Sequence, residues 1–142
     1  LLTLFPSHCV PSQLAIPLAT RWMLVREERD ADILWLSQAV PERWLKETNA
    51  VAVSGAPTRR GKINYTMETD SAGRKIILRL KSEEPLHKTI LWRPGCGRSL
   101  PANDLSCKKS NVHARYDAEQ NVLHIHPENN KTIEIVLASS TA

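Results

Sequence analysis

Glycine is scarce in this sequence, and its few copies build no recognised catalytic or nucleotide-binding loop. The chain has 142 residues and five glycines. Neither GxxxxGK(S/T) nor GxGxxG occurs, which excludes the usual glycine loops that cradle phosphates. No GxSxG is present, which excludes the nucleophile elbow of α/β-hydrolases. The sequence therefore shows no complete active site of these kinds, and we expect no cofactor.

Cysteine is rare as well, with three copies at Cys9, Cys96 and Cys107. No CxxC pair occurs, so the ligand spacing of a structural zinc site is missing. Cys96 and Cys107 flank a polar segment and could form one bridge in an oxidising compartment. We expect free thiols and keep the single bridge as the alternative, so the cysteines leave the compartment open.

Long apolar runs are also absent. No segment approaches the roughly 20 apolar residues that a membrane-spanning helix needs. At the N-terminus, Pro6, Pro11 and Pro17 interrupt the apolar residues and no basic start precedes them, which argues against a signal peptide. We expect residues 1–21 to be an irregular or short helical lead-in, broken by these prolines. Because the sequence begins at Leu1 without methionine, we expect a fragment of a longer protein.

The net charge is modest and the positive charges are scattered. The chain carries 19 basic and 15 acidic residues, a net charge of +4. The basic residues include three separated pairs, Arg59-Arg60, Arg74-Lys75 and Lys108-Lys109. Aromatic residues make up 5% of the chain, too few for a convincing base-stacking surface. We therefore expect neither nucleic acid nor a membrane as a partner.

What the sequence does contain is alternation of apolar and polar residues. Ile63, Tyr65 and Met67 share one parity, and so do Ile76, Leu78 and Leu80. A period of two indicates a strand with one buried and one wet face. The turn residues of 70–73 join the two segments. We expect a hairpin that places Met67 opposite Ile76 and Tyr65 opposite Leu78.

Further short apolar segments predict the other strands. We expect strands from Trp22, over 32–37, over 50–54 ending at Gly55, over 89–93, and near 112–116, 123–125 and 133–137. Pro41 should start one helical turn, because proline suits the first helical position. About eight short strands without a long helical period predict an antiparallel β-sandwich over residues 22–142.

Three histidines give the sharpest candidate for chemistry. In the expected hairpin His113 falls opposite His124, and His126 lies on the same face. If the last strand pairs beside them, Glu134 falls next to His124, and imidazole with carboxylate is a zinc-binding set. The same face is the polar, solvated one of the sheet, where such residues belong by default. We therefore expect no metal, and a histidine-rich metal-dependent enzyme remains the weakest alternative.

A group of carboxylates could suggest acid–base hydrolysis. The group consists of Glu27, Glu28, Asp30 and Asp32. Such hydrolysis requires two carboxylates at a fixed separation across a cleft. These four surround a loop between expected strands, where charged residues commonly lie. We therefore expect no catalytic residue here.

Four tryptophans stand beside a single phenylalanine. Trp35 and Trp92 lie in expected strands, which favours burial in the core, and Trp44 should anchor the helical turn. The alternative is that an indole ring stacks on a sugar. As carbohydrate or domain-interface candidates we select Trp22, Trp35, Trp44, Arg59 and Arg60, and we expect the three tryptophans to share one patch.

In order along the chain, DILWLSQAVPERWL, NAVAVSGAPTRRGKINYTMETD, IILRL and LHKTILWRPG resemble a known domain type. They are similar to the C-terminal β-sandwich of bacterial six-hairpin glycosidases, rhamnosidase-like and arabinofuranosidase-like enzymes with an (α/α)6 catalytic barrel. Within this resemblance, residues 56–58 are a corner between strands, and Gly61 permits the bend that follows. The family pattern carries an aromatic residue where this chain has Arg60.

The resemblance implies a function without catalysis in this chain. The catalytic acids of such enzymes lie in the barrel, which this chain does not contain, so none can be assigned here. The segment before Trp22 would be the remnant of the last barrel helix and its linker. The chain would be an accessory domain packed on that missing barrel. A free-standing carbohydrate-binding module is the alternative hypothesis.

Overall fold

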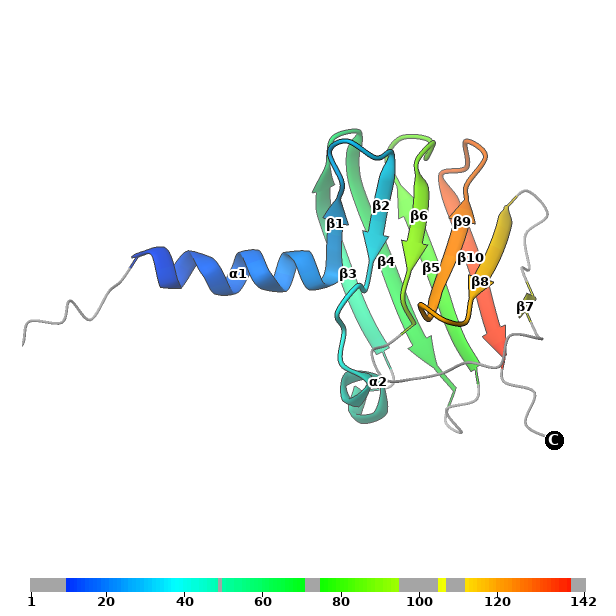
Figure 1. Cartoon of the computed structure of the whole chain (residues 1–142), viewed down its shortest axis with the longest axis horizontal. Helices are drawn as coiled ribbons and strands as arrows, with labels where there is room; N and C mark the ends of the chain where they lie inside the picture. The colour runs from blue at the N-terminus through cyan, green and yellow to red at the C-terminus, as the bar shows by residue number, and fades with distance from the viewer. Residues whose placement is uncertain (1–9, 49, 71–74, 95–104, 107–111, 139–142) are drawn as a thin grey trace, which may run out of the picture.

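The computed structural model describes residues 10–48, 50–70, 75–94, 105–106 and 112–138. They form two five-stranded sheets packed face to face, with a helix projecting from one edge (Figure 1). The predicted all-β sandwich is confirmed. The described residues form ten strands where we expected about eight, and the sandwich is not purely antiparallel, because β2 and β6 run parallel.

Sheet I has the strand order β1-β2-β6-β9-β8. Its strands are β1 (Val25–Glu27), β2 (Ile33–Leu36), β6 (Thr89–Trp92), β9 (Val122–His126) and β8 (His113–Asp117). Sheet II has the order β3-β4-β5-β10-β7. Its strands are β3 (Ala50–Thr58), β4 (Gly61–Thr69), β5 (Lys75–Ser82), β10 (Thr132–Ala138) and β7 (Leu105–Ser106). The helices are α1 (Val10–Leu24) and α2 (Glu42–Thr48).

The core lies between the sheets and contains the residues that the alternation selected. Fully buried side chains include Ile63, Tyr65 and Met67 of β4 and Ile76, Leu78 and Leu80 of β5, together with Trp92 of β6. The β4–β5 hairpin is confirmed, but its register is two residues from the predicted one. Tyr65 lies opposite Leu80, and Met67 lies opposite Leu78. A register shift of two residues keeps every side chain on the same face of the sheet. The predicted burial is therefore correct although the predicted register is wrong.

Strand β3 corrects two predictions about the stretch APTRRGKINY. The strand continues past Gly55 to Thr58, because a bulge between Val53 and Ala56 absorbs the extra residues. Gly55 takes a left-handed φ of 65°, and its N–H donates to Asn64 Oδ1 at 2.8 Å. Residues 56–58 are therefore strand rather than a corner. The turn falls on residues 59–60, before Gly61 with φ 103°.

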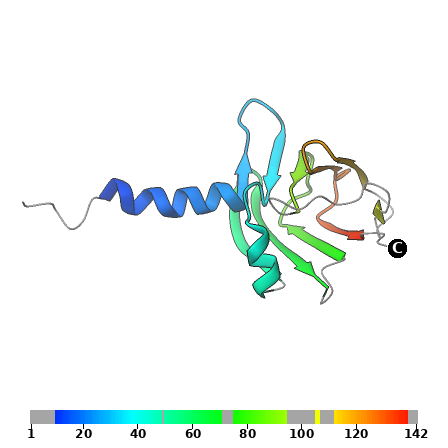
Figure 2. The same ribbon diagram turned by 60° about the horizontal axis from the view of Figure 1, so that its bottom comes forward.

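Helix α1 confirms the helical alternative for the N-terminal lead-in, but Pro17 does not break it as we expected. It runs for 15 residues through Pro17, and it includes Trp22, which we had placed at the start of a strand. A proline removes one intrahelical hydrogen bond, and the surrounding leucines and alanines have high helix propensity. Figures 1 and 2 both show α1 leaving the sandwich beside β1 and β3, which are the edge strands of the two sheets.

The C-terminal end of α1 is fastened to the sandwich by its last carbonyl groups. The Leu24 carbonyl accepts from the Ser37 N–H at 2.8 Å and from the Tyr65 hydroxyl at 3.0 Å. The Met23 carbonyl accepts from the Ala39 N–H at 3.3 Å. Carbonyls at a helix end lack intrahelical partners. Here the sandwich supplies them, which fixes the direction in which α1 projects.

Tyr65 links this junction to the core. Its hydroxyl donates to Leu24 and therefore accepts from Ser37 Oγ, at 3.1 Å. Burial raises the pKa of Tyr65 to about 12, although its hydrogen bonds with Ser37 act in the opposite direction. The phenol is consequently neutral throughout the physiological range.

Helix α2 confirms the predicted helical turn and extends it. It begins at Glu42, directly after Pro41. Glu42 in its first turn complements the helix dipole and pairs with Lys46 at 3.3 Å, four residues on. Trp44 is partly buried against the core, so its predicted anchoring role is confirmed.

Candidate functional site

A concavity lined by charged residues lies where α1 meets the sandwich. We call it the helix-root groove. It has a volume of about 300 Å³ and is lined by Arg21, Trp22, Val25, Arg26, Glu27, Arg29 and Arg59. These residues come from the end of α1, from β1 and the loop after it, and from the β3–β4 turn. The groove therefore joins two segments about thirty residues apart in the sequence, 21–29 and 59.

Two hydrogen bonds hold the walls of the helix-root groove together. Arg21 Nη2 donates to the Pro57 carbonyl at 3.0 Å, which ties α1 to β3. The backbone N–H of Arg59 donates to Glu27 Oε2 at 3.1 Å, which ties the β3–β4 turn to β1. These two hydrogen bonds connect α1 with β3, and the β3–β4 turn with β1. They hold Arg21 and the backbone of Arg59 in place at the edge of the sandwich.

The electrostatic balance of the groove is strongly positive. Four guanidinium groups line it, against the single carboxylate of Glu27. That carboxylate is already engaged, because Lys88 Nζ lies 3.3 Å from Glu27 Oε1 and both side chains are largely buried. Within the described part of the chain, none of Arg21, Arg26, Arg29 and Arg59 has a carboxylate within 4.0 Å. The groove can therefore accept an anion.

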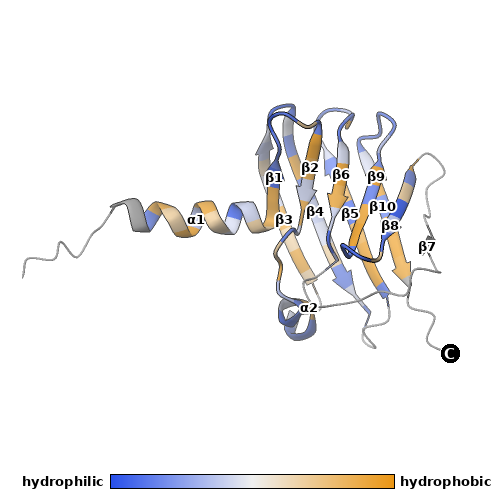
Figure 3. Cartoon of the chain, viewed as in Figure 1, coloured by the Kyte–Doolittle hydropathy of each residue, from blue (hydrophilic) through white to orange (hydrophobic). Residues whose placement is uncertain are grey.

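Trp22 gives the groove an apolar wall. Its side chain is 54% exposed, and further apolar residues of α1 are exposed as well. Leu14, Ile16 and Leu18 are 65%, 72% and 44% exposed. Figure 3 shows these hydrophobic stretches of α1 outside the sandwich. One end of the molecule thus combines an unpacked apolar helix with a basic groove at its base.

The structure places the predicted candidates at several sites. Trp22 and Arg59 meet in the helix-root groove. Arg60 instead lines a small neighbouring cavity beside Lys88. Trp35 and Trp44 are not among the groove residues, so the predicted patch of three tryptophans is not one concavity.

Trp35 lies on the outer face of sheet I, where it is held by polar groups. Its Nε1–H donates to Glu28 Oε1 at 2.8 Å. The guanidinium carbon of Arg93 lies 5.9 Å from the centre of its ring, within cation–π range. Trp35 is therefore half-buried rather than in the core as we expected, because its neighbours Leu34 and Leu36 take the inner face. Trp92 is in the core, as predicted.

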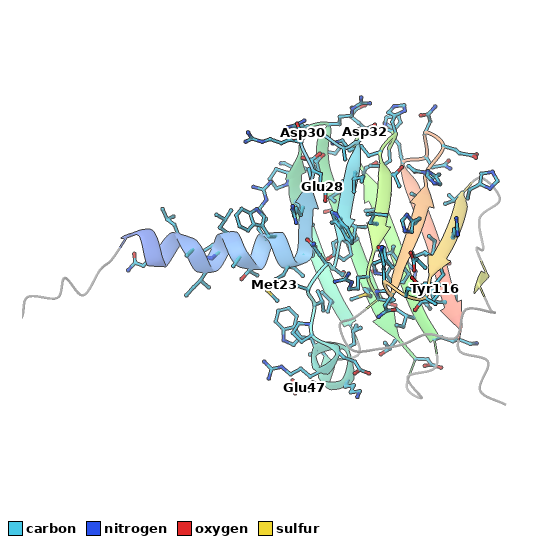
Figure 4. The ribbon with its side chains drawn as sticks, viewed as in Figure 1. Met23, Glu28, Asp30, Asp32, Glu47 and Tyr116 are labelled. Atoms are coloured by element: carbon cyan, nitrogen blue, oxygen red, sulfur yellow. The ribbon has the colours of Figure 1, made fainter. Side chains whose placement is uncertain are left out.

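Three of the four carboxylates of 27–32 are engaged by other side chains of the sandwich. Glu28, Asp30 and Asp32 lie at one end of the sandwich, and Glu47 lies on α2 toward the other end (Figure 4). Glu27 and Asp32 approach Lys88, at 3.3 and 3.8 Å, and Glu28 accepts from Trp35. These contacts give Glu27 and Glu28 structural roles.

The histidine arrangement differs from the hypothetical zinc set. His113 pairs with His126 in the β8–β9 ladder, and Arg115 lies opposite His124. The expected neighbour Glu134 belongs to β10, which pairs with β5 and β7 in the other sheet. His113 Nε2 instead lies 3.1 Å from Glu128. The described residues contain no group of three or more metal-binding side chains.

A second concavity lies on the outer face of sheet II. It also measures about 300 Å³ and is lined by residues that include Asn64, Thr66, Arg79 and Lys81. Arg79 contacts Glu68 at 2.7 Å and Glu134 at 3.0 Å, and these hydrogen bonds raise the pKa of Arg79. Tyr65, the aromatic residue in the lining, is 1% exposed. Among the described residues that line this concavity, none offers an exposed ring for a sugar.

Sequence reasoning missed three of the four arginines of the helix-root groove. Arg21, Arg26 and Arg29 fall within nine residues of sequence, which was the available signal. The intervening acidic residues concealed it, because nothing in the sequence shows that Lys88 engages Glu27. The three cysteines lie outside the described residues, so the structure does not address the predicted free thiols or bridge.

No helix among the described residues has the length and apolar character needed to cross a membrane. Comparison of the chain with protein-family models, with curated proteins and with solved structures found no match.

Proposed function

We propose that this chain is a non-catalytic accessory domain of a larger glycoside hydrolase, which docks on an (α/α)6 catalytic barrel through helix α1. The resemblance of its sequence segments to the C-terminal sandwiches of six-hairpin glycosidases supports the choice of partner. The observation that carries docking is the exposure of Leu14, Ile16 and Leu18 on a helix that projects from the sandwich. Exposed apolar residues gathered on one element mark an interaction surface.

The completeness of the sandwich supports a role in which α1 is the contact. The core residues of the two sheets are buried against one another, whereas residues 13–22 of α1 are all exposed. The contacts of α1 with the sandwich come from its last turn, through Arg21, the carbonyl of Met23, and the carbonyl and side chain of Leu24. An isolated helix of this length is marginal in water. Packing against a partner would stabilise it and remove its apolar side chains from solvent.

The absence of turnover is part of the proposal. Three of the four carboxylates of 27–32 are engaged in contacts within the sandwich, since Glu27 and Asp32 approach Lys88 and Glu28 accepts from Trp35. The purified chain should hydrolyse none of a panel of aryl glycosides, and the intact parent enzyme should hydrolyse at least one.

The test compares this chain with the product of the complete reading frame that contains it. Hydrogen–deuterium exchange should show fast exchange for amides of residues 13–22 in the chain alone and slow exchange in the parent protein. The double variant Leu14→Asp/Leu18→Asp should restore fast exchange in the parent. Ala118→Asp is the control, since Ala118 is exposed in the turn after β8, which is the edge strand of sheet I opposite β1.

Three results would overturn the proposed function. The reading frame could encode no further domain, the helix amides could exchange equally in both proteins, or the chain alone could turn over a glycoside.

A further inference from the structure

We infer that the helix-root groove binds a carboxylate-bearing sugar residue of an acidic polysaccharide. The inference rests on the proposed function for the class of ligand, since an accessory domain of a glycoside hydrolase meets saccharides. The groove itself supplies the selection for negative charge. Its volume of about 300 Å³ is at the lower end for ligand sites and suits one or two sugar rings better than a large cofactor.

The charge of the groove requires an anionic ligand. Four guanidinium groups face the one carboxylate of Glu27, which is occupied by Lys88 and by the Arg59 N–H. Arginine binds carboxylates through two parallel hydrogen bonds, so Arg26, Arg29 and Arg59 could each grip one. A neutral sugar would leave these positive charges uncompensated, and the groove would not select it.

Trp22 favours a sugar over a simple ion as the ligand of the groove. Its exposed indole lines the same groove as the arginines. An aromatic face offers an apolar surface to the C–H face of a pyranose ring, while the guanidinium groups reach the carboxylate at the ring's edge. Inorganic phosphate could use the arginines but would gain nothing from Trp22. A nucleic acid would need several stacking rings along a track, and Trp22 is the only aromatic residue in this groove.

The groove is held in shape before any ligand arrives. Arg21 is tied to the Pro57 carbonyl at 3.0 Å, and the Arg59 backbone is tied to Glu27 at 3.1 Å. The end of α1 that carries Trp22 is fixed by hydrogen bonds to the Leu24 carbonyl. Preorganisation of this kind reduces the entropy lost on binding. The groove also lies at the base of the proposed docking helix, a position at a domain boundary where ligand sites are common.

The experiment is a calorimetric titration of the whole chain with an oligogalacturonate, together with tryptophan fluorescence. A neutral oligosaccharide of the same length, inorganic phosphate and a single-stranded oligonucleotide are titrated in parallel. We expect saturable binding of the oligogalacturonate with a change in fluorescence, weakened by added salt because the contact is ionic. The three other probes should bind at least roughly tenfold more weakly.

The variants assign binding to the groove. Trp22→Ala and Arg26→Gln/Arg59→Gln should each reduce affinity by roughly tenfold or more, and Trp22→Ala should abolish the fluorescence change. Arg115→Gln is the matched control, because Arg115 is an exposed arginine on β8, at the opposite edge of sheet I. All these side chains are exposed, so circular dichroism should show an unchanged fold.

Each other outcome overturns the inference. Equal binding of the neutral oligosaccharide would show that the guanidinium groups do not select for negative charge. Binding of phosphate or the oligonucleotide in place of the uronide would assign the groove to another ligand. Absence of binding, or binding by the groove variants as tight as that of the natural chain, would show that the groove is not the binding site. The titration uses the chain alone, so it can fail while the docking test on the parent protein succeeds, and the reverse also holds.

Discussion

The interior of the sandwich and helix α1 are built from the same apolar residue types but have opposite exposure. Leu36 and Leu78 are fully buried between the sheets, whereas Leu14 is 65% exposed and Ile16 is 72% exposed on α1. Within the sheets, alternation sends every second side chain toward the other layer, and the apolar core residues occupy these positions. On α1 the apolar residues face several directions away from the sandwich. The comparison shows that the core of the sandwich forms without residues 13–22 of α1, which are all exposed.

The junction between these two regions carries the polar interactions that fix the helix and shape the groove. Tyr65 extends from the core to the Leu24 carbonyl, and Glu27 connects Lys88 with the β3–β4 turn. If the contrast between interior and helix is correct, substitutions should have their largest effect in the core. The effect should be intermediate at the junction and smallest on the helix.

The largest effect is expected inside the sandwich. Leu78→Ala should lower the free energy of unfolding by about 2–5 kcal/mol, because it leaves a cavity among fully buried neighbours. Urea denaturation followed by circular dichroism measures this loss. A loss below about 1 kcal/mol would mean that the two sheets are not packed as described.

A smaller loss is expected at the rim of the sandwich, where Glu27 and Lys88 meet. Glu27→Ala should cost about 1.5–3 kcal/mol, since it removes a charged acceptor from the largely buried Lys88 and from the Arg59 N–H. Asp32→Ala is the control, because Asp32 is 70% exposed and lies 3.8 Å from Lys88. Its cost should stay within about 0.5 kcal/mol in the same denaturation measurement.

The bond between core and helix should contribute less again. Tyr65→Phe should cost about 0.5–1.5 kcal/mol near neutral pH, the usual net value of a hydrogen bond. Because burial raises the pKa of Tyr65 from 10.0 to about 12, the folded state holds its proton more tightly than the unfolded state. This contribution to stability is therefore fully present below pH 10.0 and is lost as the pH rises toward 12.

The pH dependence separates this role of Tyr65 from simple packing. Unfolding measured across that alkaline range should show a steeper loss of stability for the natural chain than for Tyr65→Phe. Parallel curves would show that the phenol is not buried in the folded state.

The smallest effect is expected on the helix itself. Leu18→Ala should change the stability of the isolated chain by no more than about 0.5 kcal/mol, since Leu18 is 44% exposed and contacts no core. The same measurement on Leu78→Ala gives the contrast directly. A destabilisation of Leu18→Ala that approaches that of Leu78→Ala would show that α1 folds back onto the sandwich.

Several elements were predictable because their signals are local. The alternation of apolar and polar residues in β4, β5 and β10 predicted the buried residues correctly, and Pro41 predicted the start of α2. The register of β4 with β5 was not predictable in the same way, since shifts of two residues give identical burial. The continuity of α1 through Pro17 was not predicted, because the high helix propensity of the neighbouring leucines and alanines outweighs the single proline.

The sequence by itself determined that this protein is a two-layered β-fold, because a period of two separates a wet face from a buried one wherever the strand is placed. Only the tertiary structure decided which strands share a sheet. It separated Glu134 from His124 and brought Arg59 beside Trp22. The physical reason is that pairing between distant strands and the ion pair of Glu27 with Lys88 depend on contacts across the chain, which no local pattern records.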